Sequence, residues 1–149
     1  MKTRGEILAT FFGVGFFPLA PGTLASLIVV ILYKFFLCDL SWSVYLLIIL
    51  CLFFIGVFVS TQYSTELGET DPRKIVIDEA CGQLIVLFQM PTSWFLLLLG
   101  FFLFRLFDII KPYPIRKIEN LRKGWGIMLD DVLAAFYTII IIRIFLLLP

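Results

Sequence analysis

A charged segment enclosed by apolar sequence is the feature that most restricts how this chain folds. Residues 104–131, FRLFDIIKPYPIRKIENLRKGWGIMLDD, hold six of the twelve Lys and Arg residues and four of the eleven acidic residues. The apolar stretch FLLLLGFFL directly precedes this segment, and VLAAFYTIIIIRIFLLL directly follows it. Because charged side chains are costly in apolar surroundings, this arrangement indicates a site at a membrane surface that handles a charged group.

The composition of the chain is that of an integral membrane protein. Hydrophobic residues make up 61% of the sequence and charged residues 15%, and the mean hydropathy is +1.05. A soluble domain has about 25% charged residues. We therefore expect residues 1–149 to form a single membrane domain whose partners are membrane lipids, with no nucleic acid among them.

The apolar runs predict an all-α fold, a compact multi-pass membrane bundle of four to five short hydrophobic helices. Residues 7–23 contain Gly13, Gly15, Pro18 and Pro21, so we expect an irregular, re-entrant or interfacial segment there. A full crossing takes about 20 residues, and several predicted helices are shorter, so four and five crossings both remain open. The predicted helices are residues 24–37, 42–60, 76–90, 93–108 and 127–148.

The distribution of charge predicts which side of the membrane carries the site. Five crossings would place the N-terminus and the polar loops 61–75 and 109–126 on one face. Apart from Lys34 and Arg143, all Lys and Arg residues would then lie on that face. The enrichment of Lys and Arg in cytoplasmic loops makes this face cytoplasmic.

Three acidic groups interrupt the apolar sequence, at Asp78-Glu79, Asp108 and Asp130-Asp131. Carboxylates within membrane segments usually serve a function and face the interior of the helix bundle. Two of these groups also have a structural interpretation. Asp130 and Asp131 can stabilise the N-terminus of the last helix, and Asp108 can pair with Arg105 three residues earlier. All three groups on one face, beside basic residues, favour a functional site.

The residue types in this segment narrow the chemistry. The chain has no histidine, which excludes Ser-His-Asp hydrolysis, Cys-His catalysis and histidine-ligated zinc. Several carboxylates without His or Cys favour a hard cation, most plausibly Mg²⁺. Basic residues nearby supply the charge that a phosphate needs, although they can instead only orient the protein in the membrane. These basic residues are Arg105, Lys111 and Arg116, with Arg122 or Lys123 as further candidates.

The sequence resembles the phosphatidylglycerophosphatase A family of bacterial membrane phosphatases in three blocks. The first is GVGFFPLAPGTLAS, residues 13–26, which is weak when taken alone. The second is DPRKIVIDEACGQ, residues 71–83. The third is FRLFDIIKPYPIRKIENLRKGWGIMLDDVLAA, residues 104–135. The second and third blocks are specific, because IVxDExxG, FRxFDxxKPxPIR and GIMLDD follow one another in order.

The resemblance implies a Mg²⁺-dependent enzyme that removes the terminal phosphate of phosphatidylglycerophosphate and yields phosphatidylglycerol. It also implies a multi-pass protein of the bacterial inner membrane. The family's acidic pairs fall on Asp78, Glu79, Asp130 and Asp131. Its FRxFDxxKPxPIR block falls on Arg105, Asp108, Lys111 and Arg116. Ala25 and Ala135 stand where family members often have Gly, which affects close helix packing rather than the reaction.

A mechanism follows from this assignment as a hypothesis. We expect the acidic pairs at residues 78–79 and 130–131 to hold one or two Mg²⁺ ions, which activate a water for in-line attack on phosphorus. Asp108 either orients Arg105 or joins the metal site. The 13–26 segment can close the pocket with Thr23 or Ser26 reaching the phosphate, or it can be a packed turn without ligand contact.

Two alternatives from other classes remain at this stage. A small ion or anion transporter would also contain broken helices and buried acids, but it would distribute charge through the middle of the membrane. A non-catalytic membrane subunit would leave the acidic pairs unexplained.

Overall fold

The structure is a computed structural model, and it describes residues 4–121 and 123–147. Within these ranges every regular element is a helix and none is a strand, which confirms the all-α prediction. The elements, in chain order, are α1 (Arg4–Ala9), η1 (Val14–Phe16), α2 (Pro21–Leu32), η2 (Tyr33–Leu37), α3 (Trp42–Leu67), α4 (Ile77–Leu87), α5 (Trp94–Ile110), α6 (Ile115–Glu119) and α7 (Gly124–Leu147).

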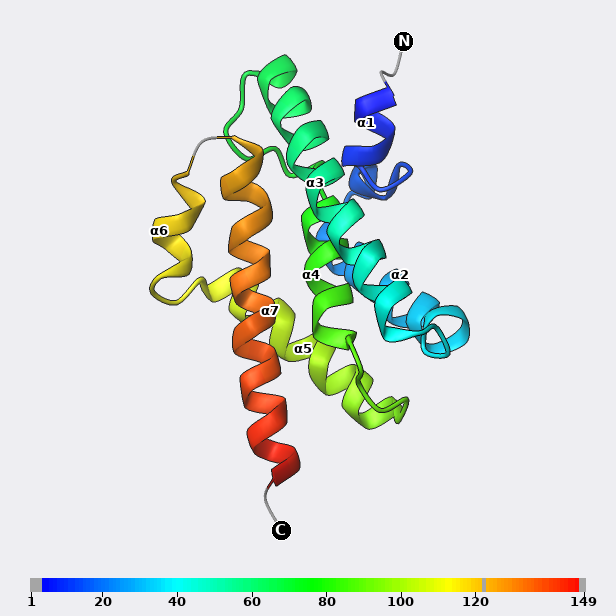
Figure 1. Ribbon diagram of the computed structural model, residues 1–149. Coiled ribbons are helices and arrows are strands. Elements are labelled where there is room, and N and C mark those ends of the chain that lie inside the picture. The colour runs from blue at the N-terminus through cyan, green and yellow to red at the C-terminus, as the bar shows by residue number, and fades with distance from the viewer. Residues whose placement is uncertain (1–3, 122, 148–149) are drawn as a thin grey trace.

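Helix α4 lies at the centre of the molecule. It packs against α2, α3, α5 and α7, and most of its residues are buried. Figure 1 shows α4 and α7 side by side and running in the same direction. Helix α5, which lies between them in the sequence, leads the chain back toward the end where α7 begins. Asp78 and Glu79, in the first turn of α4, therefore lie toward the same end of the molecule as Asp130 and Asp131, in the first half of α7.

One described helix, α3, is long and apolar enough to cross a membrane, as judged by length and composition. Its 26 residues extend for about 39 Å at 1.5 Å per residue. By contrast, α4 has only 11 residues. The expected set of four or five crossing helices is therefore not confirmed, although large apolar side chains are exposed along α2, α3, α5 and α7.

Helix α3 continues beyond its predicted end at residue 60. The Thr61 hydroxyl donates to the Val57 carbonyl at 2.6 Å, and the Thr65 hydroxyl donates to the Thr61 carbonyl at 2.6 Å. These side chains bond back to their own helix, so the polar sequence stays helical. The helix ends only at Gly68, whose φ of 69° is left-handed. The predicted loop 61–75 was therefore too long.

Two short helices lie where the sequence predicted irregular chain. Helix α1 occupies part of the expected re-entrant segment, and α6 lies within the expected loop 109–126. In the rest of the N-terminal segment, Val14–Phe16 form η1 and Pro21 begins α2, and the remaining residues are irregular as predicted. Helix α7 begins three residues earlier than predicted. Residue 148, at the predicted end of the last helix, lies outside the described residues.

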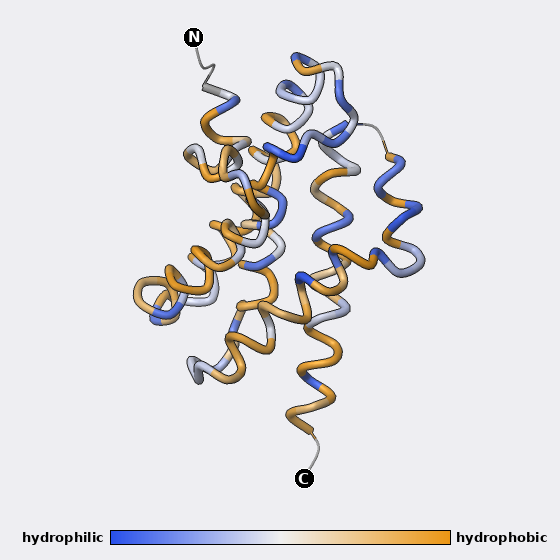
Figure 2. The backbone as a smooth tube through the Cα atoms, turned by 180° about the vertical axis from the view of Figure 1, so that it is seen from behind, coloured by the Kyte–Doolittle hydropathy of each residue, from blue (hydrophilic) through white to orange (hydrophobic). Residues whose placement is uncertain are grey.

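Hydrophilic residues gather toward one end of the fold. Figure 2 shows them mainly at the end where the N-terminus lies, while the helices toward the other end are largely hydrophobic. Lys34 Nζ donates to the Thr92 carbonyl at 2.6 Å, and Arg143 lines a small depression with Met90 and Pro91, so both lie near the turn between α4 and α5. This separation gives the molecule one polar end and one apolar end.

Candidate active site

A cavity of about 820 Å³ opens at the polar end of the fold. Its walls come from four parts of the chain that are distant in sequence. Residues 15–22 and 71–75 form one side, and the ends of α4 and α5 with Asp130 of α7 form the other. The cavity therefore brings parts of all three sequence blocks together.

Helix α4 begins with two acidic residues. Asp78 and Glu79 occupy its first turn, where backbone N–H groups without helical partners favour negative charge. Both side chains line the cavity. Asp78 Oδ1 and Glu79 Oε2 are buried without a hydrogen-bond partner. These two oxygens are thus free to receive a ligand from the cavity.

Helix α7 contributes the second pair, which is more deeply buried. Asp130 is 4% exposed and Asp131 is 1% exposed. The Asp131 backbone N–H donates to Asp130 Oδ1 at 2.9 Å, and Lys111 Nζ donates to Asp130 Oδ2 at 2.8 Å. Asp131 Oδ2, in contrast, is buried without a partner. The two neighbouring acids therefore differ, since Asp130 is engaged by protein donors and Asp131 is available.

The carboxylates form two groups that share one member. Asp78, Glu79 and Asp131 each place an oxygen within 4.8 Å of the others, and so do Asp108, Asp130 and Asp131. Oxygen-only ligand sets of this kind suit Mg²⁺. Asp78, Glu79 and Asp131, which each have one buried oxygen without a hydrogen-bond partner, are the three members of the first group. The residues present therefore fit a hard divalent cation.

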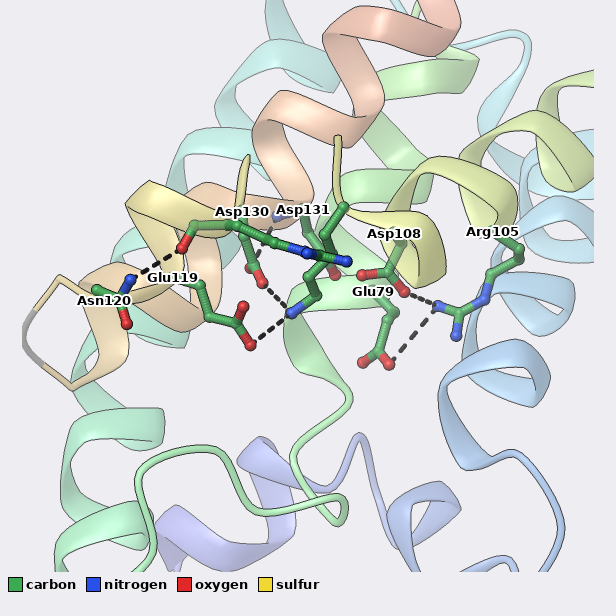
Figure 3. Close-up of polar contacts among 9 residues, drawn as sticks. Glu79, Arg105, Asp108, Glu119, Asn120, Asp130 and Asp131 are labelled. Carbon is green, nitrogen blue, oxygen red and sulfur yellow. Dashed lines mark hydrogen bonds and ion pairs between the residues drawn. The ribbon is translucent and has the colours of Figure 1, made fainter. Parts of the chain in front are cut away.

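Two basic side chains reach into the acidic groups, and Figure 3 shows both sets of contacts. Arg105 Nη1 lies 2.8 Å from Asp108 Oδ2 and 3.6 Å from Glu79 Oε1. Asp108 therefore does orient Arg105, as one of the two sequence interpretations proposed, and it also belongs to the second carboxylate group.

Lys111 is held by backbone and side-chain contacts. It ends α5 with a left-handed φ of 47°, an uncommon conformation for a residue other than Gly. Its Nζ bridges Asp130 Oδ2 at 2.8 Å and Glu119 Oε1 at 2.9 Å. Burial alone would lower the pKa of Lys111, but the Asp130 and Glu119 carboxylates outweigh this effect and raise that pKa. Lys111 is therefore a fixed positive charge at the edge of the acidic cluster.

Comparison with known sequences places this chain in a family. A sequence model described as phosphatidylglycerophosphatase A matches residues 7–146, nearly the whole chain. The chain belongs to the phosphatidylglycerophosphatase A family. No solved structure matches the chain significantly.

Three curated relatives align with most of this chain. Phosphatidylglycerophosphatase A of Haemophilus influenzae is 42% identical over 139 residues, covering 92% of this chain and 85% of that protein. The Escherichia coli protein of the same name is 38% identical over 136 residues, covering 90% of this chain and 78% of that protein. A Bacteroides thetaiotaomicron protein named "Putative phosphatidylinositol-3-phosphatase" is 41% identical over 147 residues, covering 93% of this chain and 91% of that protein.

Glycines in the blocks that carry the family resemblance allow the acidic side chains to come together. A Cβ on Gly22, at the start of α2, would lie 1.8 Å from Glu79 Oε1 and 3.2 Å from Arg105 Nη2. A Cβ on Gly82 in α4 would lie 3.2 Å from the Asp131 Cβ. The first sequence block, which is weak by itself, therefore supplies a glycine that packs directly on the site.

The structure does not bring every residue predicted for phosphate binding to the cavity. Thr23 is half-buried and Ser26 is fully buried in α2, and neither lines the cavity. Arg116 is exposed on α6, also outside the cavity wall. Lys123 lines a separate depression, and Arg122 lies outside the described residues. Membership of the 13–26 block, for Thr23 and Ser26, or of the polar segment after α5, for Arg116 and Lys123, was not sufficient to place these side chains in the cavity.

Sequence reasoning missed four charged residues near the site. Glu119 binds Lys111, and Asp71, Arg73 and Lys74 line the cavity. Arg73 and Lys74 belong to the DPRK sequence of the second family block, which was the available signal. Glu119 gave none, because its pairing with Lys111 depends on how α6 folds back toward α7.

Proposed function

We propose that this chain hydrolyses the terminal phosphomonoester of phosphatidylglycerophosphate in a Mg²⁺-dependent reaction, giving phosphatidylglycerol and inorganic phosphate. The observation that carries the proposal is the pair of carboxylate groups that share Asp131 beside the cations Arg105 and Lys111 in one cavity. The family and the names of two relatives support the substrate.

The acidic residues have separate roles in this proposal. Asp78, Glu79 and Asp131 would hold the cation through their free oxygens, and Asp108 and Asp130 would complete a second position. A divalent cation bound there supplies Lewis-acid activation of a phosphate ester. Because Lys111 and the Asp131 N–H engage both oxygens of Asp130, this residue mainly orders the cluster.

The basic residues stabilise the charge of the reacting phosphate. Arg105 and Lys111 both line the cavity and are held in place by carboxylates. Positively charged groups fixed in advance stabilise developing negative charge without reorganising during the reaction. We therefore assign Arg105 and Lys111 to the phosphate oxygens and leave Arg116, Thr23 and Ser26 without a direct role.

We further propose that the chain is a multi-pass protein of the bacterial inner membrane with its cavity at the cytoplasmic face. The apolar character of α3 and the exposed apolar side chains of the other long helices support insertion. The gathering of hydrophilic residues at one end supports a site at the membrane surface (Figure 2). A transporter would need acids distributed along its path, whereas the acids of α4, α5 and α7 lie in a single cluster.

A phosphorylated phosphatidylinositol is a second candidate substrate. The observation that favours it is the Bacteroides relative, whose identity to this chain is close to that of the two phosphatidylglycerophosphatases. Both candidate lipids carry a phosphomonoester on a headgroup that a phosphodiester joins to diacylglycerol. The site therefore accounts for the reaction in either case, and substrate comparison must choose between them.

The test is phosphate release in detergent micelles from phosphatidylglycerophosphate and, separately, from phosphatidylinositol 3-phosphate. Each is measured with Mg²⁺ and with EDTA, for the wild type, Asp78→Asn and Asp131→Asn. We expect release from phosphatidylglycerophosphate that EDTA abolishes and that both variants reduce by about 10²-fold or more. Asp39→Asn is the matched control. Asp39 lies in the turn between η2 and α3, outside the cavity, so this variant should retain wild-type activity.

The outcomes separate the parts of the proposal. Faster release from the inositol lipid would replace the proposed substrate and keep the reaction. Full activity in EDTA would remove the role of Mg²⁺. The absence of release from either lipid would refute the phosphatase function itself.

A further inference from the structure

Next to Asp71, the cavity wall contains two exposed cations that form no ion pair among the described residues. Arg105 and Lys111 are paired with acids, as described above. Arg73 and Lys74 also line the cavity, but neither forms an ion pair with any acidic residue within residues 4–121 and 123–147. Two unpaired positive charges in a concave site favour an anionic ligand.

The backbone around these two cations is firmly placed. The Ile75 N–H donates to the Pro72 carbonyl at 2.9 Å, and the Val76 N–H donates to the Ala9 carbonyl at 3.0 Å. A Cβ on Gly15 would lie 1.9 Å from the Lys74 carbonyl oxygen, so the N-terminal segment packs directly against this turn. The turn is thus fixed between the N-terminal segment and α4.

The same side of the cavity is lined by apolar groups. Lys74 Nζ lies 5.7 Å from the centroid of the Phe16 ring, a cation–π contact that positions the ammonium. Phe17 and Leu19 line the cavity and are 45% and 76% exposed. Cations beside exposed apolar side chains suit the part of a phospholipid where phosphate meets acyl chains.

The cavity is larger than a single phosphate group requires. Its volume of about 820 Å³ lies in the range of sites that enclose whole small molecules. The acidic cluster with Arg105 and Lys111 accounts for one phosphate. Arg73 and Lys74, from a different segment, remain for a second anionic group of the same ligand.

We propose that Arg73 and Lys74 bind the phosphodiester of the lipid, the phosphate that stays on the product, while the phosphomonoester lies at the acidic cluster. This inference rests on the proposed function and adds the specificity for a headgroup with two phosphates. Arg73 provides a fork of N–H donors for the diester oxygens, and Lys74 provides a point charge beside the acyl chains. Both are binding residues and neither takes part in the chemical step.

The experiment compares Arg73→Gln and Lys74→Gln with the wild type, using phosphatidylglycerophosphate in neutral detergent micelles with Mg²⁺. Lys117→Gln is the matched control, because Lys117 is an exposed cation on α6 outside the cavity. Loss of one charge-assisted contact should raise KM about tenfold with kcat within about twofold of wild type. Arg73→Lys should recover part of the affinity, and Lys117→Gln should leave KM unchanged.

Two inhibitors separate binding of the diester from binding of the monoester. Phosphatidylglycerol carries only the diester, and inorganic phosphate mimics only the leaving group. Arg73→Gln and Lys74→Gln should weaken inhibition by phosphatidylglycerol about tenfold and leave inhibition by inorganic phosphate unchanged.

Several results would overturn the assignment. These are an unchanged KM, an equal rise in KM in Lys117→Gln, a fall in kcat alone, or weakened inhibition by inorganic phosphate. A wild-type enzyme that phosphatidylglycerol does not inhibit would also overturn it. A wild type inactive on phosphatidylglycerophosphate would instead refute the proposed function, which the release assay detects before any variant is made.

Discussion

Replacing Gly22 by Ala tests whether the acidic cluster needs the close approach of α2. The new Cβ would lie 1.8 Å from Glu79 Oε1, whereas Cβ contacts below 3.0 Å essentially do not occur. The Glu79 carboxylate must therefore retreat by at least about 1.2 Å. A misplacement of about 1 Å in a catalytic constellation can cost about 10²-fold in rate. This loss corresponds to about 2.7 kcal/mol of transition-state stabilisation.

The stability of Gly22→Ala should change little, which separates the effect from misfolding. Glu79 is the end of a flexible side chain beside a cavity, so it can move without disturbing the helix backbone. Ala is also the better helix former by up to about 1 kcal/mol. We expect the midpoint of thermal unfolding to stay within about 4 °C of wild type.

The assay is steady-state phosphate release with Mg²⁺, combined with thermal unfolding in the same detergent. Gly100→Ala in α5 is the control, because its Cβ would only meet Val86 Cγ1 at 3.1 Å, away from the cavity. The control should keep kcat within about twofold of wild type, since its Cβ disturbs no charged group. A Gly22→Ala protein with wild-type kcat would refute the requirement for this packing.

Three further predictions concern individual contacts. Asp130→Asn should lower kcat about tenfold and Asp131→Asn about 10²-fold or more, because only Asp131 has a free oxygen; equal losses would contradict the separate roles. Lys111→Gln should lower the free energy of unfolding by up to about 3 kcal/mol, because it leaves the buried Asp130 without its cation. In the same denaturation experiment, Glu119→Gln should lower it by less than about 1 kcal/mol, because the Glu119 carboxylate is more exposed. Tyr45→Phe should lower the unfolding midpoint by about 2–4 °C, because the Tyr45 hydroxyl donates to the Leu84 carbonyl near the end of α4, and an unchanged midpoint would show that this bond is not stabilising.

The sequence predicted the helices well where apolar residues mark them and poorly where polar residues continue them. Helix α2 begins at Pro21, three residues before its predicted range of 24–37, since Pro favours the first turn of a helix. The end of α3 was misplaced because Thr61 and Thr65 bond to their own helix rather than ending it. Helix α6 was missed because hydropathy gives no signal in a charged segment of five residues.

The grouping of the acids was accessible from sequence, but the division of labour within it was not. Motif order and the shared face brought Asp78, Glu79, Asp130 and Asp131 into one predicted site. In the structure Asp78, Glu79 and Asp130 line one cavity, and Asp131 is buried next to them. Which oxygen is free depends on the rotation of each helix and on Lys111, whose left-handed backbone no pattern indicated. The placement of Arg73 and Lys74 depends on the packing of Gly15 against their turn.

The common direction of α4 and α7 has a consequence for how this protein can vary in evolution. Helix α4 starts at the acidic cluster, and α7 passes through the cluster in its first half and runs in the same direction. The chain between them must come back once, which α5 accomplishes (Figure 1). Adding a single further traverse between residues 87 and 124 would send Asp130 and Asp131 to the far end of the molecule. Length changes in this part of the gene are therefore compatible with the site only as loops or as pairs of helices.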